Sequence, residues 1–107
     1  MTRLAVITGS VRPNRVGTGV ARWVAEKAST VEGVEAEVLE LADFHLPVFA
    51  EEVPPMMAAP KALARFDAYI FVTPEYNRSV PGALKNAIDF IVPSVLANKA
   101  VGLVGYS

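Results

Sequence analysis

Apolar and polar residues form two kinds of pattern along this chain, one typical of strands and the other of helices. Two short, continuous apolar runs, at 4–7 and 68–72, are typical of buried strands, and a third apolar run at 100–104 predicts another strand. A further segment alternates apolar residues with glutamates, as an exposed edge strand does. The four expected strands lie at residues 4–7, 34–41, 68–72 and 100–104. Apolar residues at helical spacing predict helices over 18–28, over 61–66 and from Pro81 to about Phe90.

This alternation of strands and helices predicts an α/β fold in which right-handed crossovers build a doubly wound parallel sheet. Ligands of such sheets bind at the carboxyl ends of the strands. Three loops leave those ends, at residues 9–17, 73–80 and 105–107. The proline-rich segment 42–60 cannot sustain a helix and is expected to be a long surface connection.

The first of these loops, residues 9–17, has the composition of a phosphate site. Gly9 and Gly17 let the backbone approach a ligand closely, and the helix that follows adds free N–H groups and the positive end of its dipole. Further donors come from Ser10, Arg12, Asn14, Arg15 and Thr18. No acidic residue precedes Glu26 in the sequence. The alternative is an ordinary strand-to-helix turn with Thr18 as its cap and two solvated arginines.

Other nucleotide-binding loops do not match this segment. The G-x-x-x-x-G-K-[ST] pattern of a P-loop is missing from the sequence, and Arg22 stands where the dinucleotide fingerprint requires its third glycine. A mononucleotide phosphate therefore fits the first loop better than ATP, GTP or a dinucleotide.

The loop after the third expected strand combines a stiff, proline-bounded backbone with an aromatic ring and an amide. Its backbone N–H groups can reach the polar edge of a planar heterocycle such as an isoalloxazine, while Tyr76 packs near the ring. The alternative is a turn that only initiates the helix at Pro81.

Two motifs carry a resemblance to a known family. Gly9-Ser10-x-Arg12 and Thr73-Pro74-Glu75-Tyr76-Asn77-x-Ser79-x-Pro81-Gly82-x-Leu84-Lys85-Asn86-Ala87-Ile88-Asp89 resemble the NADPH-dependent FMN reductase family, and residues 101–107 resemble the start of its third flavin loop. The resemblance implies one flavodoxin-like, three-layer domain over 1–107, with about four strands in the order 2-1-3-4. The family's fifth strand would be missing, and the chain would be truncated at its C-terminus.

The resemblance also implies a set of cofactor-binding residues. Those expected around the FMN phosphate are Ser10, Arg12, Asn14, Arg15, Val16, Gly17 and Thr18. Those expected at the isoalloxazine are Pro74, Glu75, Tyr76 and Asn77, with Ser107 at the third loop. Because the flavin performs the chemistry in this family, no catalytic side chain is implied.

The expected activity is hydride transfer from NADPH or NADH through FMN to a quinone, a flavin or a similar acceptor, in a homodimer or homotetramer. Two alternatives stay open at this point. One is a truncated, non-catalytic binding or assembly module that covers its exposed sheet edge by self-association. The other, weaker one is a flavodoxin-like electron carrier.

The composition of the chain excludes several classes of protein and of binding site. At 107 residues, 52% of them hydrophobic and 20% charged, the chain fits one globular domain. A net charge of -1 gives no general attraction to nucleic acid or anionic lipid, and the absence of cysteine excludes thiolate metal sites and thiol nucleophiles. The apolar run 4–7 is too short for a signal peptide or a membrane span, so we expect a cytoplasmic protein.

A few isolated residues have more ordinary explanations. His45 is expected to be structural, and Glu51 and Glu52 are expected to be solvated, so no metal site is predicted. Trp23 is expected in the core or at an interface. The pair Met56 and Met57 is consistent with a lid or a subunit contact.

Overall fold

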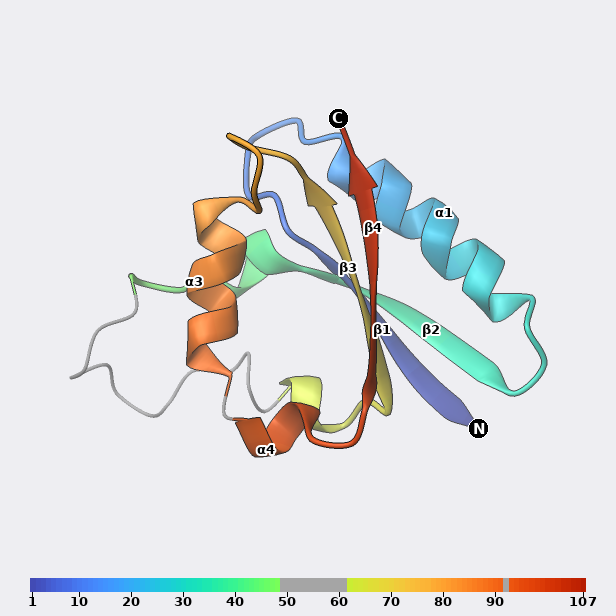
Figure 1. The fold of residues 1–107 in the computed structure, drawn as a ribbon. Coiled ribbons are helices and arrows are strands. Elements are labelled where there is room, and N and C mark those ends of the chain that lie inside the picture. The colour runs from blue at the N-terminus through green and yellow to red at the C-terminus, as the bar shows by residue number, and fades with distance from the viewer. Residues whose placement is uncertain (49–61, 92) are drawn as a thin grey trace.

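The computed structural model describes residues 1–48, 62–91 and 93–107, and its strands form a parallel sheet (Figure 1). The strands are β1 (Thr2–Thr8), β2 (Val34–Glu40), β3 (Ala68–Pro74) and β4 (Ala100–Tyr106), in the spatial order β2-β1-β3-β4. The helices are α1 (Gly17–Ser29), the 3₁₀ helix η1 (Leu41–Phe44), α3 (Gly82–Phe90) and the short α4 (Pro93–Leu96), and residues 62–64 form a further helical turn. The expected strand order 2-1-3-4 is confirmed.

The register of the sheet brings the last residues of all four strands to one edge. Thr8 at the end of β1 is opposite Glu40 of β2, and Pro74 at the end of β3 is opposite Tyr106 of β4. Parallel strands must end on the same side, because each crossover returns the chain to the other end of the sheet. We call the side formed by Thr8, Glu40, Pro74 and Tyr106 the carboxyl edge.

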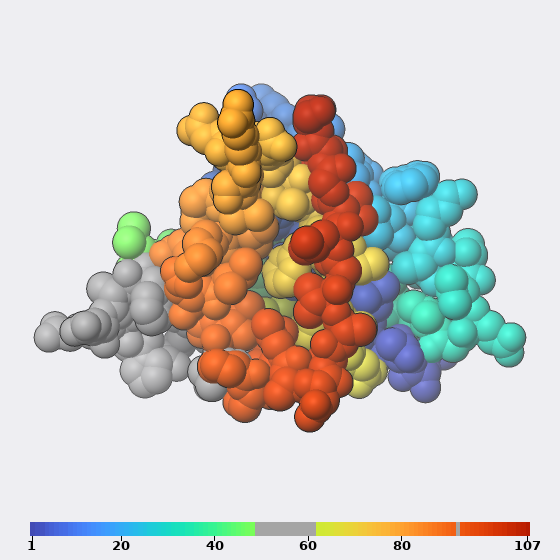
Figure 2. Space-filling model, viewed as in Figure 1, coloured from blue at the N-terminus to red at the C-terminus, as the bar shows by residue number. Residues whose placement is uncertain are grey.

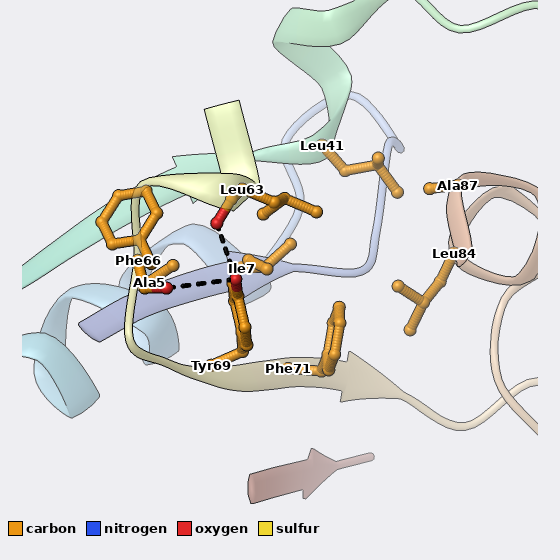
Figure 3. Close-up of a cluster of buried hydrophobic side chains, with 9 residues drawn as sticks. All are labelled: Ala5, Ile7, Leu41, Leu63, Phe66, Tyr69, Phe71, Leu84 and Ala87. Atoms are coloured by element: carbon orange, nitrogen blue, oxygen red, sulfur yellow. Dashed lines mark hydrogen bonds between the residues drawn. The ribbon is translucent and has the colours of Figure 1, made fainter. Parts of the chain in front are cut away.

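Each face of the sheet is covered by helix, which gives three layers (Figure 1). Successive side chains of a strand point to opposite faces. Leu4 and Val6 of β1 therefore pack with Ala21 and Val24 of α1. The alternate residues of β1 pack on the other side with α3, in a cluster of Ala5, Ile7, Leu41, Leu63, Phe66, Tyr69, Phe71, Leu84 and Ala87 (Figure 3). The continuous apolar runs of β1 and β3 reflect this burial on two faces, whereas the apolar run of β4 lies at the sheet edge with Leu103 75% exposed.

A buried phenol secures the end of the sheet opposite the carboxyl edge. The hydroxyl of Tyr69 donates to the carbonyl of Leu63 at 2.6 Å, as Figure 3 shows, and accepts from the ammonium of Lys99 at 3.2 Å. Tyr69 is 1% exposed, so its polar atom needs these partners. This end is therefore occupied by packing and hydrogen bonds.

Several local expectations need correction. Trp23 is 57% exposed, so of its two expected places the core is wrong, because only one side of α1 contacts the sheet, and the interface stays a prediction. The cap position of α1 is Val16 and not Thr18, since Thr18 lies inside the first turn. Pro81 precedes α3 as its cap and is not in its first turn. The expected connection 42–60 begins with η1, and Glu51, Glu52, Met56 and Met57 lie outside the described residues.

Within the described part of the chain, no helix is both long and apolar enough to cross a membrane. The same residues contain no group of three or more side chains that could hold a metal ion.

Candidate functional site

The three loops at the carboxyl edge meet around one cavity of about 270 Å³. Figure 2 shows them at the same end of the molecule, with the loop after β1 in blue, the loop after β3 in gold and orange, and the end of β4 in red. The cavity is lined by Ser10, Arg12, Pro13, Asn14, Arg15, Val16, Pro74, Glu75, Tyr76, Tyr106 and Ser107. Residues that are far apart in the sequence therefore form one site.

Gly9 allows the first loop to lie close to the sheet. Its N–H donates to the carbonyl of Val72 at 2.8 Å, which continues the pairing of β1 with β3 beyond the strand. A Cβ at this position would lie 2.9 Å from Leu84 Cδ2 and 3.3 Å from the Val72 oxygen. Any larger residue would push the loop away from β3 and α3.

Ser10 and Arg12 present donors to the cavity. The Ser10 side chain is buried, and its oxygen accepts the Arg12 N–H at 3.3 Å, which leaves its own proton free to donate to a ligand. The Arg12 side chain is exposed and has no hydrogen bond or ion pair to any described residue. Asn14 turns the loop with φ of 55°, a left-handed conformation that asparagine tolerates well. The first loop thus offers one uncommitted cation.

Arg15 is instead bonded within the protein. Its Nε and Nη2 donate to Glu40 Oε2 at 3.4 and 3.2 Å, and its Nη1 donates to the carbonyl of Arg12 at 3.1 Å. The Thr18 hydroxyl lies 2.7 Å from Glu40 Oε1 and 3.0 Å from Oε2, and it donates to this carboxylate. Although no acidic residue precedes Glu26 in the sequence, the fold thus brings the carboxylate of Glu40 beside this loop.

The carboxyl group of Glu40 is held in its charged form. Burial alone would raise its pKa, but hydrogen bonds from Thr18 and Arg15, the positive charge of Arg15 and a hydrogen bond from Thr8 outweigh burial. The net effect is a pKa below the ordinary value of 4.5. Glu40 is a functional candidate that the sequence did not indicate.

The loop after β3 is a tight hairpin. Tyr76 N–H donates to the Ser79 carbonyl at 2.9 Å, and Ser79 N–H donates to the Tyr76 carbonyl at 3.1 Å. Asn77 and Arg78 between them both have positive φ, at 51° and 65°, as a two-residue type I′ turn requires. The amides of Tyr76 and Ser79 are thus used inside the loop, so the predicted ligand donors would have to be other N–H groups of the loop.

A second cavity of about 470 Å³ adjoins the first along this hairpin. The two cavities share Pro74, Glu75, Tyr106 and Ser107. The second one extends over Arg78 and Val80, on the outer side of the hairpin. Together they fall in the size range of small-molecule sites in proteins, roughly 300 to 1,000 Å³.

Tyr106, which lines both cavities, is a second residue that sequence analysis missed. Its hydroxyl is so close to α1 that a Cβ on Gly17 would lie 2.5 Å from it. Burial raises the pKa of Tyr106, and the neighbouring Tyr76 and Glu40 raise it further. The phenol therefore stays protonated, as a donor between the first loop and the hairpin.

Comparison with known proteins identifies the family. The sequence profile described as NADPH-dependent FMN reductase matches residues 2–107. The chain belongs to this family. The resemblance of the two motifs is thereby confirmed over almost the whole chain.

Relatives of this FMN reductase family member include enzymes from fungi and bacteria. The chain is 38% identical over 121 residues to the NAD(P)H-dependent FMN reductase ntnL of a Nectria species, a match that covers 99% of this chain and 60% of the relative. It is 42% identical over 93 residues to a quinone reductase of Pseudomonas putida, which covers 80% of this chain and 47% of the relative. The chain thus spans about half to three fifths of these relatives.

Solved structures support the expected fold class. FerB, a flavoenzyme NAD(P)H:(acceptor) oxidoreductase from Paracoccus denitrificans, matches with a TM-score of 0.74 and 29% identity. The match covers 100% of this chain and 62% of FerB. The apo form of the NADH:FMN oxidoreductase EMOB matches with a TM-score of 0.75 and 22% identity, which is evidence for the fold alone. This match covers 100% of this chain and 60% of EMOB. The flavodoxin-like, three-layer parallel sheet is confirmed.

Most of the residues expected at the site do line the cavity. The exceptions are Gly17, Thr18 and Asn77. Gly17 is buried against the Tyr106 hydroxyl, and Thr18 is turned toward Glu40. Asn77 lies at the exposed turn of the hairpin, beyond the cavity wall.

His45 lines neither of the two cavities at the carboxyl edge. It has φ of 49° and lines a largely apolar cavity of about 700 Å³, between η1 and the start of α3. Its neighbours there include Leu41, Leu46 and Ala83. No carboxylate and no other histidine of the described chain lines this cavity, and His45 itself is exposed.

Proposed function

We propose that the carboxyl edge binds FMN and that the protein is an NAD(P)H-dependent FMN or quinone reductase. The observation that carries this proposal is the cavity that joins a phosphate-type loop at the start of α1 to the hairpin after β3 and the end of β4. A mononucleotide with a planar ring needs both a cationic end and a stiff, partly aromatic end, and this cavity offers both.

The first loop fits the phosphate end of FMN. Ser10 offers a hydroxyl proton, Arg12 offers an uncommitted positive charge, and the start of α1 adds the positive end of its dipole. Glycine at position 9 keeps the backbone close to the sheet. Our proposed residues of the phosphate site, whether they contact the phosphate or hold the loop in place, are Ser10, Arg12, Asn14, Arg15, Val16, Gly17 and Thr18.

The hairpin and the end of β4 fit the isoalloxazine end. Pro74 and Glu75 lie on the wall shared by the two cavities, and Tyr76 is 36% exposed, so its ring is accessible beside them. FMN, when bound, supplies the hydride-accepting chemistry, and the protein orients it and tunes its electronics. Our proposed residues here are Pro74, Glu75, Tyr76 and Ser107, with Asn77 contributing through the turn that shapes the hairpin.

The remaining parts of the proposal rest on the family. NADPH or NADH would be the electron donor, and a quinone or a flavin would be the acceptor, as the names of the relatives indicate. We also propose a homodimer or homotetramer in the cytoplasm. A non-catalytic assembly module is not favoured, since the relatives are named as reductases.

Steady-state oxidation of NADPH and NADH by the purified protein tests this function. We expect oxidation that requires FMN and that becomes faster when a quinone is added. The loss of nicotinamide absorbance measures its rate. Riboflavin in place of FMN is the matched control, because it has the same ring without the phosphate. No oxidation of either nicotinamide at saturating FMN would contradict the proposed activity.

A further inference from the structure

The guanidinium of Arg15 connects two parts of the carboxyl edge. All three of its nitrogens donate within the protein, two to the Glu40 carboxylate and one to the Arg12 carbonyl. Only 21% of the Arg15 side chain and 15% of the Glu40 side chain are exposed. This arginine therefore holds the loop after β1 to the end of β2, and few of its donors remain for a ligand.

Glu40 also anchors the start of α1. Both of its carboxylate oxygens lie within hydrogen-bond distance of the Thr18 hydroxyl, in the first turn of that helix. The proton of this hydroxyl is directed to Glu40, so it is not available to a phosphate oxygen. One carboxylate thus holds the C-terminal part of the loop, through Arg15, and the first turn of α1, through Thr18.

The charges explain why such an acid is tolerated beside an anion site. A lone carboxylate there would repel a phosphate, but the positive charge of Arg15 lies 3.2 Å from Glu40 and balances it. Arg12 then remains as the cation that no described residue neutralises. The two arginines, equivalent in the sequence, have different surroundings in the structure.

We propose that Glu40 and Arg15 are positioning residues for the phosphate loop, and that Arg12, with Ser10 and the loop amides, meets the phosphate charge. This inference rests on the proposed FMN function. The loop contains Asn14 in a left-handed conformation, and the Arg15 bond to the Arg12 carbonyl closes the turn around it. A loop ordered before binding gives tighter binding, because the ligand does not have to order it.

The competing arrangement makes the opposite prediction for Glu40. If Arg15 left Glu40 and bound the phosphate directly, Glu40 would only compete for its charge. Removing Glu40 would then strengthen FMN binding, whereas removing a positioning residue weakens it. The sign of the change distinguishes the two arrangements.

Titration of the protein with FMN and with riboflavin, followed by flavin fluorescence, measures this sign. Glu40→Ala and Arg15→Ala should each weaken FMN binding about tenfold, with riboflavin binding unchanged, and the double variant should be no weaker than either single one. Glu37→Ala is the matched control, because Glu37 lies on the same strand in an exposed ion pair with Arg65 at 3.1 Å. FMN binding by Glu40→Ala as tight as in the wild type, or tighter, would overturn the inference.

Amide hydrogen exchange of the protein without flavin tests the positioning role separately. Glu40→Ala should speed exchange of the amides of residues 11–17, and Glu37→Ala should not. Unchanged exchange in Glu40→Ala would overturn the positioning role even if FMN binds. Absence of FMN binding in the wild type, with faster loop exchange in Glu40→Ala, would instead contradict the proposed function alone.

Discussion

At the scale of single residues, the two arginines of the first loop differ in their interactions. Arg15 is paired with Glu40, while the side chain of Arg12 is exposed at the cavity with no partner among the described residues. An exposed, unpaired guanidinium gives its full charge to an incoming anion, whereas a paired one has already been neutralised. In the proposed site, Arg12 would therefore supply most of the positive charge that the loop offers to the phosphate.

Replacing Arg12 with alanine should weaken FMN binding by about tenfold to a hundredfold, the effect of losing one or two charge-assisted hydrogen bonds. Riboflavin binding should not change, because riboflavin has no phosphate. Arg22→Ala is the control, since Arg22 is an exposed arginine farther along α1. Equal losses for FMN and riboflavin in Arg12→Ala would show that Arg12 does not bind the phosphate.

Glu40 also predicts how stability depends on pH. Its pKa is lowered in the folded protein, so its interactions stabilise the fold above the ordinary value of 4.5 and are lost as the pH falls through the lowered pKa. The difference in unfolding free energy between wild type and Glu40→Gln should be greatest near neutral pH and should shrink below 4.5. Denaturant unfolding at a series of pH values measures it. A difference that stays constant into acid would contradict the lowered pKa.

At the scale of elements, the start of α1 and the end of β4 are fitted to each other. Gly17 leaves room for the Tyr106 hydroxyl, and an added Cβ would lie 2.5 Å from that oxygen and 3.4 Å from Cζ. A second glycine in the same turn, Gly19, has open space around it. Replacing each glycine with alanine therefore separates two effects: the contact with Tyr106, which only Gly17 makes, and the higher helix propensity of alanine, which applies to both.

Gly19→Ala should stabilise the protein by about 0.5–1 kcal/mol, because alanine is the better helix former. Gly17→Ala should lose this gain and weaken FMN binding, because Tyr106 must move. Adding Tyr106→Phe to Gly17→Ala should restore stability, since it removes the one atom in close contact. Thermal unfolding measures all three variants, and equal gains from both glycine replacements would contradict the contact.

The hairpin after β3 gives a second prediction at this scale. Arg78 has φ of 65°, which is unfavourable for a residue with a side chain, and glycine follows asparagine in the preferred type I′ turn. Arg78→Gly should therefore stabilise the protein, by about 1 kcal/mol at most. The same change at Arg22, inside α1, should destabilise it by about that amount. Thermal unfolding that gives the same sign at both positions would contradict the turn assignment.

The strands and helices could be predicted from the sequence because burial leaves a local pattern. A strand covered on both faces is continuously apolar, as β1 and β3 are. Glu40 could not be assigned to the site, because it lies 25 positions from Arg15 and only the register of β2 on β1 brings them together. The core position expected for Trp23 was wrong because helical spacing identifies an apolar side of α1, but not how much of it the sheet covers.

At the scale of the whole molecule, the parallel sheet separates packing from chemistry. The end near Tyr69 and Lys99 is closed by buried hydrogen bonds, whereas the carboxyl edge collects loops from three strands around connected cavities. A doubly wound sheet places ligand sites at this edge for the same reason. The central claim is thus that this edge holds FMN, by its phosphate in the first loop and by its ring at the hairpin.

A single titration tests that claim most directly. Visible absorbance of the purified protein, recorded as FMN and then riboflavin are added, reports on both the ring and the phosphate. We predict a saturable change in the flavin bands with FMN and clearly weaker binding of riboflavin. A flavin spectrum that stays the same as that of free FMN at every protein concentration would contradict the account.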